Sequence, residues 1–227
     1  LLTDENVEKH CLPLIKKQLP NPTIISLPPG EASKSIEKTR HVWTQLLQKN
    51  ADRKSLLVNL GGGVVGDLGG FAASTFKRGI DFINIPTTLL AMVDASIGGK
   101  TGIGFGGIKN AIGTFSNPKA VFIYPDFLKT LPPREIKSGF AEIIKHALIS
   151  GNDNWKMLIQ ITDLKTTDWQ NIIPQSLQVK KEIVEKDALE KGPRKQLNFG
   201  HTIGHAIEAI SLENEADPLL HLSLIHI

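Results

Sequence analysis

Two histidines near the end of the chain have a spacing that suggests chemistry. In LNFGHTIGHA, His201 and His205 stand four positions apart, so on a helix they lie about 40° apart around the axis. They could bind one metal ion together, or one could ligate it while the other acts as an acid or base. Two partly exposed histidines are the simpler interpretation. Gly200 and Gly204 favour a ligand site, because glycine inside a helix costs about 1 kcal/mol relative to alanine. His221 is a further candidate ligand.

Glu142 and Lys145 form a second pair, in the run AEIIKHA. Residues three positions apart share a helix face, so the carboxylate and the ammonium group can meet. An exposed salt bridge is the common explanation of such a pair. By itself the pair therefore does not indicate a function.

A glycine cluster follows the strand-like apolar run at residues 56–60. Residues 61–66, GGGVVG, fit the pattern G-x-G-x-x-G in front of a helix predicted at residues 68–77. Such a turn brings backbone N–H groups to a phosphate or dinucleotide, although glycine clusters also mark ordinary tight turns. The acidic residue expected about 20 positions later is not evident, because Asp81 comes too early.

A second apolar run, residues 82–85, stops at Pro86, Thr87 and Thr88. Both runs are typical of buried parallel strands. Ligands of open α/β sheets bind beyond the carboxyl ends of such strands. The arrangement predicts a nucleotide or phosphate site.

The run SIGGKT resembles a P-loop, but that motif needs a glycine where this chain has Asp94. Asp94 and Lys100 could form a solvated ion pair. However, the glycine-rich run at residues 98–107 predicts a flexible loop, and Lys109 follows it closely. Lysines in such loops suit phosphate groups.

The order of the elements predicts an α/β doubly wound layer followed by an all-helical part. Strands alternate with helices up to a last strand at residues 120–124, where Pro125, Pro132 and Pro133 mark a boundary. We predict an α/β domain at 1–124 and an all-α domain at 125–227. The expected helices are 4–19 (with Val7, Cys11, Leu14 and Ile15 at helical spacing), 33–50 (with Ile36, Val42, Trp43, Leu46 and Leu47 inward), 68–77, 133–150, 155–165, 169–189 with Pro174 near its start, and 197–210; the first strand after the opening helix is 23–27.

Composition narrows the class of protein. The chain has 227 residues, 41% hydrophobic and 22% charged, with a net charge of +3, which fits a folded protein with a real core. It has no basic block with interleaved aromatic residues and only one tyrosine, so nucleic acid is not an expected partner. No apolar run is long enough to span a membrane. The single cysteine, Cys11, excludes an internal disulfide and favours a reducing compartment such as the cytoplasm.

Five segments together resemble the 3-dehydroquinate synthase family. They are GGGVVGDLGGFAAS, FKRGIDFINIPTTLLAMVDASIGGKTGI, KN-x-x-G-x-F, FLKTLPPREIKSGFAEIIKHALI and R-x-x-LNFGHTIGHAIEA, in the order that the family has. The combination of PTTLLAMVDASIGGKT with LNFGHTIGHA is highly specific. The chain lacks an initiator methionine, opens on the tail of a strand and ends in mid-pattern, so we expect a fragment of a longer protein.

The resemblance implies a homodimeric enzyme with a Rossmann-like NAD-binding α/β half and a helical, metal-binding half. Its reaction converts 3-deoxy-D-arabino-heptulosonate 7-phosphate into 3-dehydroquinate and phosphate. The steps are a transient oxidation by NAD, β-elimination of phosphate, re-reduction and an intramolecular aldol closure. Zinc, or another divalent metal such as cobalt, serves as the Lewis acid.

Position by position, the resemblance implies three sets of residues. The metal ligands are Glu142, His201 and His221. The residues matching the NAD-contacting segments are Glu31, Lys34, Gly62, Gly63, Val64, Val65, Gly66, Asp67, Thr87, Thr88, Lys100, Lys109, Phe127, Leu128, Lys129 and Thr130. The catalytic and substrate-contacting residues are Asp94, Asn110, Lys145, Lys180, Arg194, Asn198 and His205, together with Arg78, which reaches the substrate phosphate of the partner subunit.

Two alternatives remain beside the synthase. One is a sister enzyme, either another sugar-phosphate cyclase or an NAD-linked, metal-dependent alcohol dehydrogenase. GGKTGI, KN and LNFGHTIGH favour the synthase over the dehydrogenases. The other is a fragment that binds NAD or nothing and catalyses no reaction.

Overall fold

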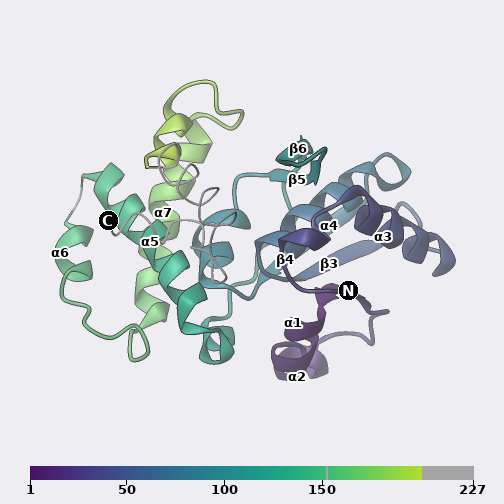
Figure 1. The fold of residues 1–227 in the computed structure, drawn as a ribbon, viewed down its shortest axis with the longest axis horizontal. Coiled ribbons are helices and arrows are strands. Elements are labelled where there is room, and N and C mark those ends of the chain that lie inside the picture. The colour runs from purple at the N-terminus through teal and green to yellow at the C-terminus, as the bar shows by residue number, and fades with distance from the viewer. Residues whose placement is uncertain (152, 201–227) are drawn as a thin grey trace. The chain divides into compact units, whose positions relative to one another are not determined.

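The computed structural model describes residues 1–151 and 153–200. The chain divides into two compact units, and the division falls between Thr130 and Leu131. The first unit is an α/β structure, and the described part of the second contains helices only (Figure 1). None of the described helices is long and apolar enough to cross a membrane.

The first unit alternates strands and helices as far as its fourth strand and then adds a hairpin. Its elements are β1 (Leu2–Asp4), α1 (Glu5–His10), α2 (Leu12–Ile15), the 3₁₀ turns η1 (Lys16–Gln18) and η2 (Glu31–Ser33), β2 (Ile25–Leu27), α3 (Ile36–Gln48), β3 (Leu56–Gly61), α4 (Gly63–Thr75), η3 (Phe76–Arg78), β4 (Asp81–Pro86), the π-helical turn η4 (Ala91–Ala95), β5 (Lys100–Phe105), β6 (Ile108–Phe115) and η5 (Pro125–Thr130).

The four-stranded parallel sheet has the order β2-β1-β3-β4. The order changes direction between β1 and β3, and such a switch point in a doubly wound sheet is where ligands bind. Strands β3 and β4 pair in a register that places Asn59 of β3 opposite Asn84 of β4. The apolar runs of β3 and β4 thus form adjacent buried strands, as the sequence predicted.

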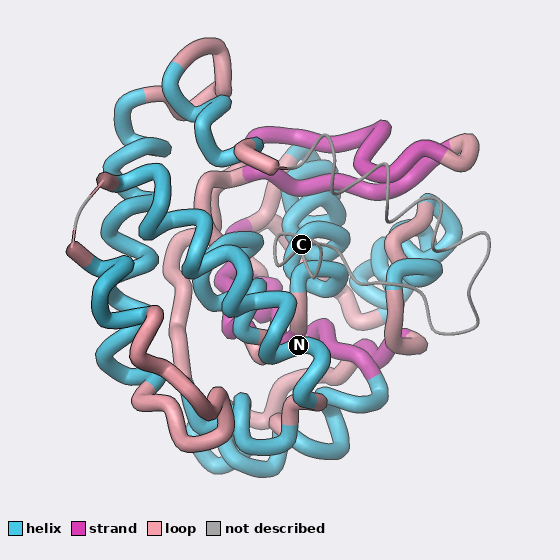
Figure 2. Tube along the Cα trace, turned by 60° about the vertical axis from the view of Figure 1, so that its left-hand side comes forward, coloured by secondary structure: helices cyan, strands magenta, loops and turns pink. Residues whose placement is uncertain are grey.

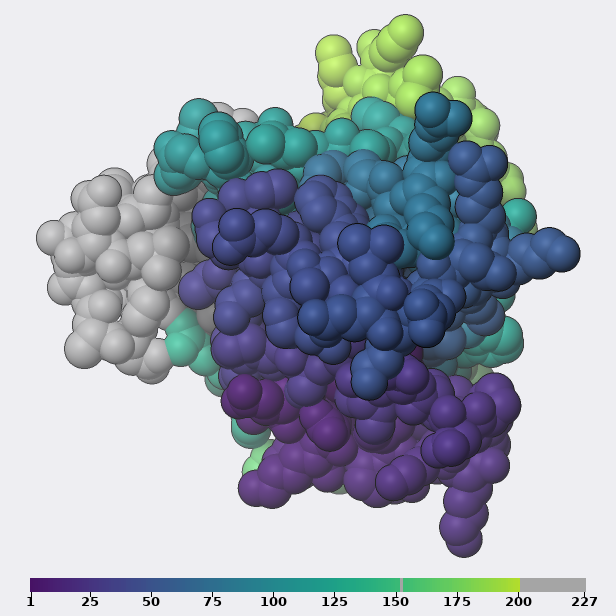
Figure 3. Space-filling view, turned by 90° about the vertical axis from the view of Figure 1, so that its right-hand side faces the viewer, coloured from purple at the N-terminus to yellow at the C-terminus, as the bar shows by residue number. Residues whose placement is uncertain are grey.

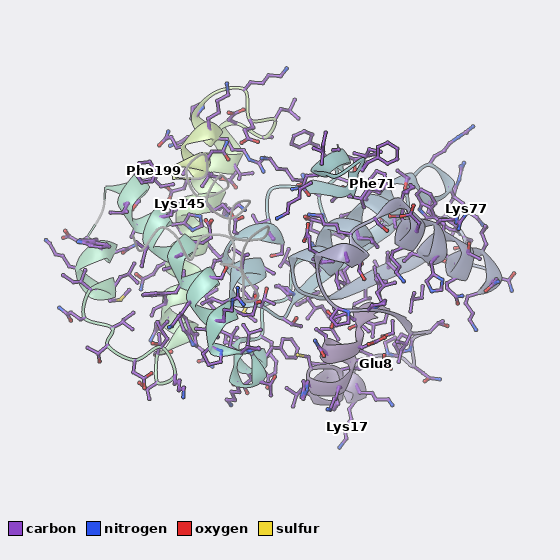
Figure 4. The ribbon with its side chains drawn as sticks, in the orientation of Figure 1. Glu8, Lys17, Phe71, Lys77, Lys145 and Phe199 are labelled. Carbon is purple, nitrogen blue, oxygen red and sulfur yellow. The ribbon has the colours of Figure 1, made fainter. Side chains whose placement is uncertain are left out.

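Helices α3 and α4 form a layer on this sheet (Figure 1). The indole N–H of Trp43 on α3 donates to the carbonyl of Ala72 on α4 at 3.1 Å. Phe71 of α4, labelled in Figure 4, is buried. The centroid of its ring lies 6.4 Å from that of Trp43. Leu47 is 59% exposed, so the prediction that it faces inward is wrong. Figure 3 views the molecule from the side where this unit faces the reader, with its first helices in purple and α3 and α4 in indigo and blue.

Several predicted helix bounds of this unit are corrected. The opening helix breaks into α1, α2 and η1, because Pro13 at the start of α2 cannot continue α1. The break leaves Leu14 49% exposed. Helix α4 begins at Gly63, five residues before the predicted start, so most of the glycine cluster is its first turn. The strand predicted at 120–124 is reduced to one bridge between Val121 and Asn84.

The glycine-rich run predicted to be a flexible loop forms a β-hairpin, drawn in Figure 2 as two adjacent magenta segments. Gly106 and Gly107 have φ of 59° and 81°, which is the backbone that a two-residue hairpin turn needs. Gly102 lies opposite Gly113 across the ribbon. A Cβ on Gly102 would lie 2.7 Å from the carbonyl oxygen of Ile112, so the glycines permit close strand pairing.

The described elements of the second unit are α5 (Pro133–Ser150), α6 (Asn154–Leu158), α7 (Trp169–Lys186) and the 3₁₀ helix η6 (Pro193–Asn198). Helices α5 and α7 pack together, and η6 lies against both. The rings of Phe140 on α5 and Trp169 on α7 meet edge to face at 6.2 Å.

Three predicted bounds in this unit are also wrong. Helix α6 ends at Leu158 rather than at 165. Helix α7 begins at Trp169 as predicted, with Pro174 in its second turn, but it ends at Lys186 rather than at 189. Residues 199–200 form a turn instead of continuing a helix from 197, and Gly200 has a φ of 78°. Gly200 therefore serves a left-handed turn, so the argument from a glycine inside a helix fails at this position.

Candidate functional site

The carboxyl ends of β3 and β4 lie side by side in the first unit. The backbone N–H of Thr87 donates to the carbonyl of Gly61 at 3.0 Å. A Cβ on Gly62 would lie 3.0 Å from Cγ2 of Thr88, so only glycine fits there easily. Because α4 starts at Gly63, the first N–H groups of that helix are presented at the same edge of the sheet. This edge can bind an anionic group through its backbone.

Thr87 supplies a polar atom at this edge. Its side chain is 2% exposed, and its Oγ1 has no hydrogen-bond partner among the residues that the structure describes. A buried hydroxyl without a partner is unfavourable by about 1–3 kcal/mol, so a ligand group that bonded to it would gain that free energy. Thr87 and Gly62 therefore fit a polar ligand held at the ends of β3 and β4.

Lys34 and Asp67 form an ion pair of 2.5 Å beside this edge. The Lys34 side chain is 7% exposed and that of Asp67 22%. Burial raises the pKa of Asp67, and the nearby charges of Glu31 and Asp94 raise it further, while Lys34 acts in the opposite direction. The site therefore gathers Glu31, Lys34, Asp67 and Asp94, four of the residues that the sequence pointed to.

Other predicted residues of the first unit are spread more widely. The hairpin carries three of them, Lys100, Lys109 and Asn110, and all three are exposed. A hydrogen bond of 2.9 Å from the N–H of Gly104 to the carbonyl of Lys34 connects the hairpin to the site. In η5, Phe127 and Leu128 are buried, whereas Lys129 and Thr130 are exposed. Arg78 is exposed, with a left-handed backbone at a φ of 71°.

In the second unit, α5 buries the pair that the sequence could not distinguish from a surface salt bridge. Glu142 and Lys145 form an ion pair, and both side chains are 1% exposed. Lys145 lies on α5 among the packed helices of this unit (Figure 4). Taking both charges out of water has a large desolvation penalty, which an exposed pair would not have. The pair is therefore not an exposed surface salt bridge.

His146, to which the sequence analysis gave no role, is fully buried beside this pair. Its Nε2 lies 3.8 Å from Oε2 of Glu142, and its Nδ1 shares a hydrogen bond of 2.7 Å with Oγ of Ser176 on α7. The i,i+4 spacing of Glu142 and His146 was a signal that could have found this residue. Ser176, 30 positions further on, had no local signal.

Lys180 on α7 and Arg194 on η6 are also buried, at 4% and 2% exposure. Together with Lys145, they place three buried cationic side chains against one buried carboxylate in the described part of this unit. Since α5, α7 and η6 pack on one another, this excess of positive charge suits an anionic ligand. Asn198 is exposed and donates to Glu190 at 2.7 Å.

Asp187 shapes the turn that carries Arg194. Its carboxylate accepts hydrogen bonds from the N–H groups of Lys191 at 2.9 Å, Gly192 at 2.6 Å and Arg194 at 3.2 Å. The Arg194 side chain then donates to the carbonyl of Ala188 at 2.6 Å. Burial acts to raise the pKa of Asp187, but these backbone hydrogen bonds and the Arg194 charge outweigh it and lower the pKa.

The three predicted histidines, His201, His205 and His221, lie outside the described residues. Glu142 is thus the one predicted metal ligand whose surroundings are seen. Its carboxylate lies in a buried, charged environment in which a divalent cation would find an oxygen ligand.

Both halves of the chain match models of one family. Residues 24–138 match the family "3-dehydroquinate synthase N-terminal" and residues 139–221 match "3-dehydroquinate synthase C-terminal". A 3-dehydroquinate synthase of Parabacteroides distasonis is 48% identical over 225 residues, which are 97% of this chain and 64% of that protein. The chain thus spans under two thirds of the length of this relative.

Solved structures of related enzymes have the same fold. A 2-deoxy-scyllo-inosose synthase, solved with carbaglucose-6-phosphate, NAD⁺ and Co²⁺, superposes with a TM-score of 0.84 at 28% identity, over 99% of this chain and 63% of that one. A 2-epi-5-epi-valiolone synthase from Streptomyces hygroscopicus, with NAD⁺ and Zn²⁺ bound, gives a TM-score of 0.77 at 26% identity, over 99% of this chain and 64% of that one.

Proposed function

The chain belongs to the 3-dehydroquinate synthase family, and we propose that its protein converts 3-deoxy-D-arabino-heptulosonate 7-phosphate into 3-dehydroquinate with release of phosphate. The observation that carries this proposal within the structure is the burial of Glu142 and Lys145 at 1% exposure. Removing both charges from water lowers the free energy of unfolding of the protein. A function in ligand binding explains why such a pair is present. We propose that this ligand is the metal and substrate of the family's reaction.

The metal ligands in this proposal are Glu142, His201 and His221. One carboxylate and two imidazoles form a donor set that zinc accepts with a position left open for a substrate, and cobalt accepts similar ligands. When bound, the metal would act as a Lewis acid on the substrate hydroxyl that is oxidised. The structure supports the carboxylate member of this set, through its buried position on α5.

The proposed NAD site is the edge formed by β3 and β4. The residues proposed to line it include Lys34, Gly62 and Thr87, with the N-terminal turn of α4 facing the pyrophosphate. The buried Oγ1 of Thr87 and the tight approach of Gly62 to Thr88 fit a polar group held against the backbone. When bound at this edge, NAD would supply the reversible oxidation of the substrate that the proposed reaction needs.

The protein's own contribution is mainly to hold a doubly anionic substrate. We assign Lys145, Lys180 and Arg194 to its carboxylate and phosphate groups, because buried cations bind such groups strongly. Asp94, Asn110, Asn198 and His205 are proposed to contact its remaining polar groups. The phosphate itself can remove the proton during elimination, which leaves positioning as the task of these side chains.

A homodimer in the cytoplasm completes the proposal. The exposed Arg78, carried at the end of η3, is proposed to reach the substrate phosphate of the partner subunit. The reducing compartment is inferred from Cys11, which is a free thiol.

Phosphate release from 3-deoxy-D-arabino-heptulosonate 7-phosphate by the purified chain tests the activity. The assay is run with and without NAD, with His201→Ala and Lys145→Met as site variants and Lys137→Met as an exposed-lysine control on the same helix. NAD-dependent release that both site variants abolish supports the proposal. If neither this chain nor one extended to the length of its relatives releases phosphate, the synthase assignment is wrong.

Another sugar-phosphate cyclase is the second candidate, because the 2-deoxy-scyllo-inosose synthase structure superposes with a TM-score of 0.84. Incubation with other phosphorylated sugars, followed by product analysis, separates the two activities. A chain that binds NAD but turns over no sugar phosphate would match the non-enzymatic alternative.

A further inference from the structure

We infer that His146 and Ser176 are positioning residues for Glu142, so that Ser176 orients the His146 ring and the ring, together with Lys145, fixes the Glu142 carboxylate for a metal ion. This inference rests on the proposed role of Glu142 as a metal ligand. It concerns His146, which faces the Glu142 carboxylate, and Ser176, which is hydrogen-bonded to His146. Neither residue belongs to the set that the sequence predicted.

The geometry links two helices through one imidazole ring. Nδ1 of His146 on α5 and Oγ of Ser176 on α7 are 2.7 Å apart. The opposite ring nitrogen, Nε2, lies 3.8 Å from Oε2 of Glu142. The ring is hydrogen-bonded to α7 on one side and contacts the carboxylate on the other, at a distance longer than a hydrogen bond. Its orientation is set by a residue on a different helix.

The surroundings of the ring strengthen this link. His146 is 0% exposed and Ser176 4%. The small cavity that they border is lined mostly by apolar side chains, among them Ile143, Ile172 and Val179. In such surroundings a hydrogen bond to the ring nitrogen is stronger than one in water.

Both neighbours of the carboxylate act on the same oxygen. Lys145 pairs with Oε2 of Glu142, and Nε2 of His146 faces that oxygen as well. Because residues i+3 and i+4 flank residue i on a helix, the Lys145 ammonium group pairs with the carboxylate and the His146 ring packs beside it on the same turn of α5. A carboxylate anchored through one oxygen has little freedom to rotate, which pre-organises it as a ligand.

The hydrogen bond between Ser176 and His146 adds little net stability, because both groups give up hydrogen bonds to water to form it. Its larger effect is on orientation. Groups that orient a metal ligand typically change metal affinity by about 10–100-fold when they are replaced. We therefore expect a change in metal affinity rather than a loss of fold.

The test is Co²⁺ binding by the 227-residue chain, measured by competition with a chelator and by visible absorption of the bound ion. Ser176→Ala should raise the Kd for Co²⁺ about tenfold and alter the absorption bands. Ser176→Thr keeps the hydroxyl and should return the Kd close to that of the unsubstituted chain. Val179→Ala, a truncation of a buried apolar residue one turn further along α7, should lower the Tm while leaving the Kd unchanged.

Three results would overturn the inference. Ser176→Ala could bind Co²⁺ as the unsubstituted chain does while Glu142→Gln abolishes binding; the proposed ligand would then stand and the positioning role would be wrong. Val179→Ala could weaken binding as much as Ser176→Ala, which would indicate general loosening of α7. If Glu142→Gln leaves the Kd unchanged, or the chain binds no Co²⁺, the proposed metal role fails and the positioning role fails with it.

Discussion

Helices α4 and α5 are both largely buried, yet they bury opposite kinds of residue. Helix α4 has 13 residues, and its fully buried positions are Val65, Leu68, Gly69, Gly70, Phe71, Ala72 and Ala73, all apolar. Helix α5 has 18 residues and buries Glu142, Lys145 and His146 among its apolar positions. The difference indicates that α4 contributes its N-terminal backbone and the Asp67 carboxylate to a site, whereas the charged groups that α5 contributes are buried side chains.

The two ion pairs of these regions differ in the same way. Lys34 and Asp67 are 33 positions apart, so their pair joins distant segments of the first unit. Glu142 and Lys145 lie on the same turn of α5, so their pair does not connect segments that are distant in the sequence. The first pair therefore supports the tertiary structure, and the second presents charge at a fixed place.

The largest effect is expected from Lys145→Met, which leaves the Glu142 carboxylate buried without its ammonium partner. Breaking a buried pair on one side typically lowers the free energy of unfolding by about 3–5 kcal/mol. Urea denaturation measures the change, and Glu142→Gln combined with Lys145→Met should recover part of it. Lys137→Met, an exposed lysine on the same helix, is the matched control. Equal urea midpoints for Lys145→Met and Lys137→Met would contradict the desolvation of the Glu142–Lys145 pair on α5.

Gly69→Ala tests the close packing of α4. An added Cβ would collide with Oδ1 of Asn59, whose amide also donates to Asn84 at 3.0 Å and is not free to move away. We expect a loss of about 1–3 kcal/mol in the free energy of unfolding. Gly66→Ala is the control on the same helix, because nothing lies within 4 Å of its added Cβ, and it should stabilise by up to about 1 kcal/mol. Equal losses at both positions would show that backbone packing does not set α4 apart.

Lys34→Met should have a smaller effect than Lys145→Met, because Asp67 is 22% exposed and water can solvate it when its partner is lost. We expect a loss of about 1–2 kcal/mol in the free energy of unfolding. Weaker NAD binding, measured by calorimetry, should accompany it. Lys49→Met, an exposed lysine after α3, is the control. A loss as large as that of Lys145→Met would mean that the two pairs are equally desolvated.

The smallest effect concerns acid stability of the turn at Asp187. The pKa of this carboxyl is lowered below its ordinary value of 3.8 in the folded protein. An acid with a depressed native pKa stabilises the fold above its ordinary pKa, and this contribution is lost as the pH falls through the native pKa. The Tm difference between the unsubstituted chain and Asp187→Asn should therefore be present at neutral pH and shrink below about pH 4. A difference that stays constant with pH would contradict the role of the carboxylate.

The sequence by itself was enough to locate the elements with strong patterns. The apolar runs of β3 and β4 and the long helix α5 were found near their observed positions. It did not find the hairpin β5–β6, because its glycines hide the alternation by which strands are usually recognised. It also started α4 too late, since helix propensity counts against glycine where a close approach of backbone requires it.

For the candidate site, too, the sequence indicated some features and only the structure showed the others. Spacing drew attention to Glu142 and Lys145 as a pair on one helix face, and matched family motifs singled out Lys34, Lys180 and Arg194. Only the tertiary structure showed that Glu142 and Lys145 are buried, and that His146 meets Ser176 from another helix. Periodicity is a property of neighbouring residues, so the sequence contains it. Burial depends on which distant segment packs over a side chain, and that is decided only when the whole chain folds.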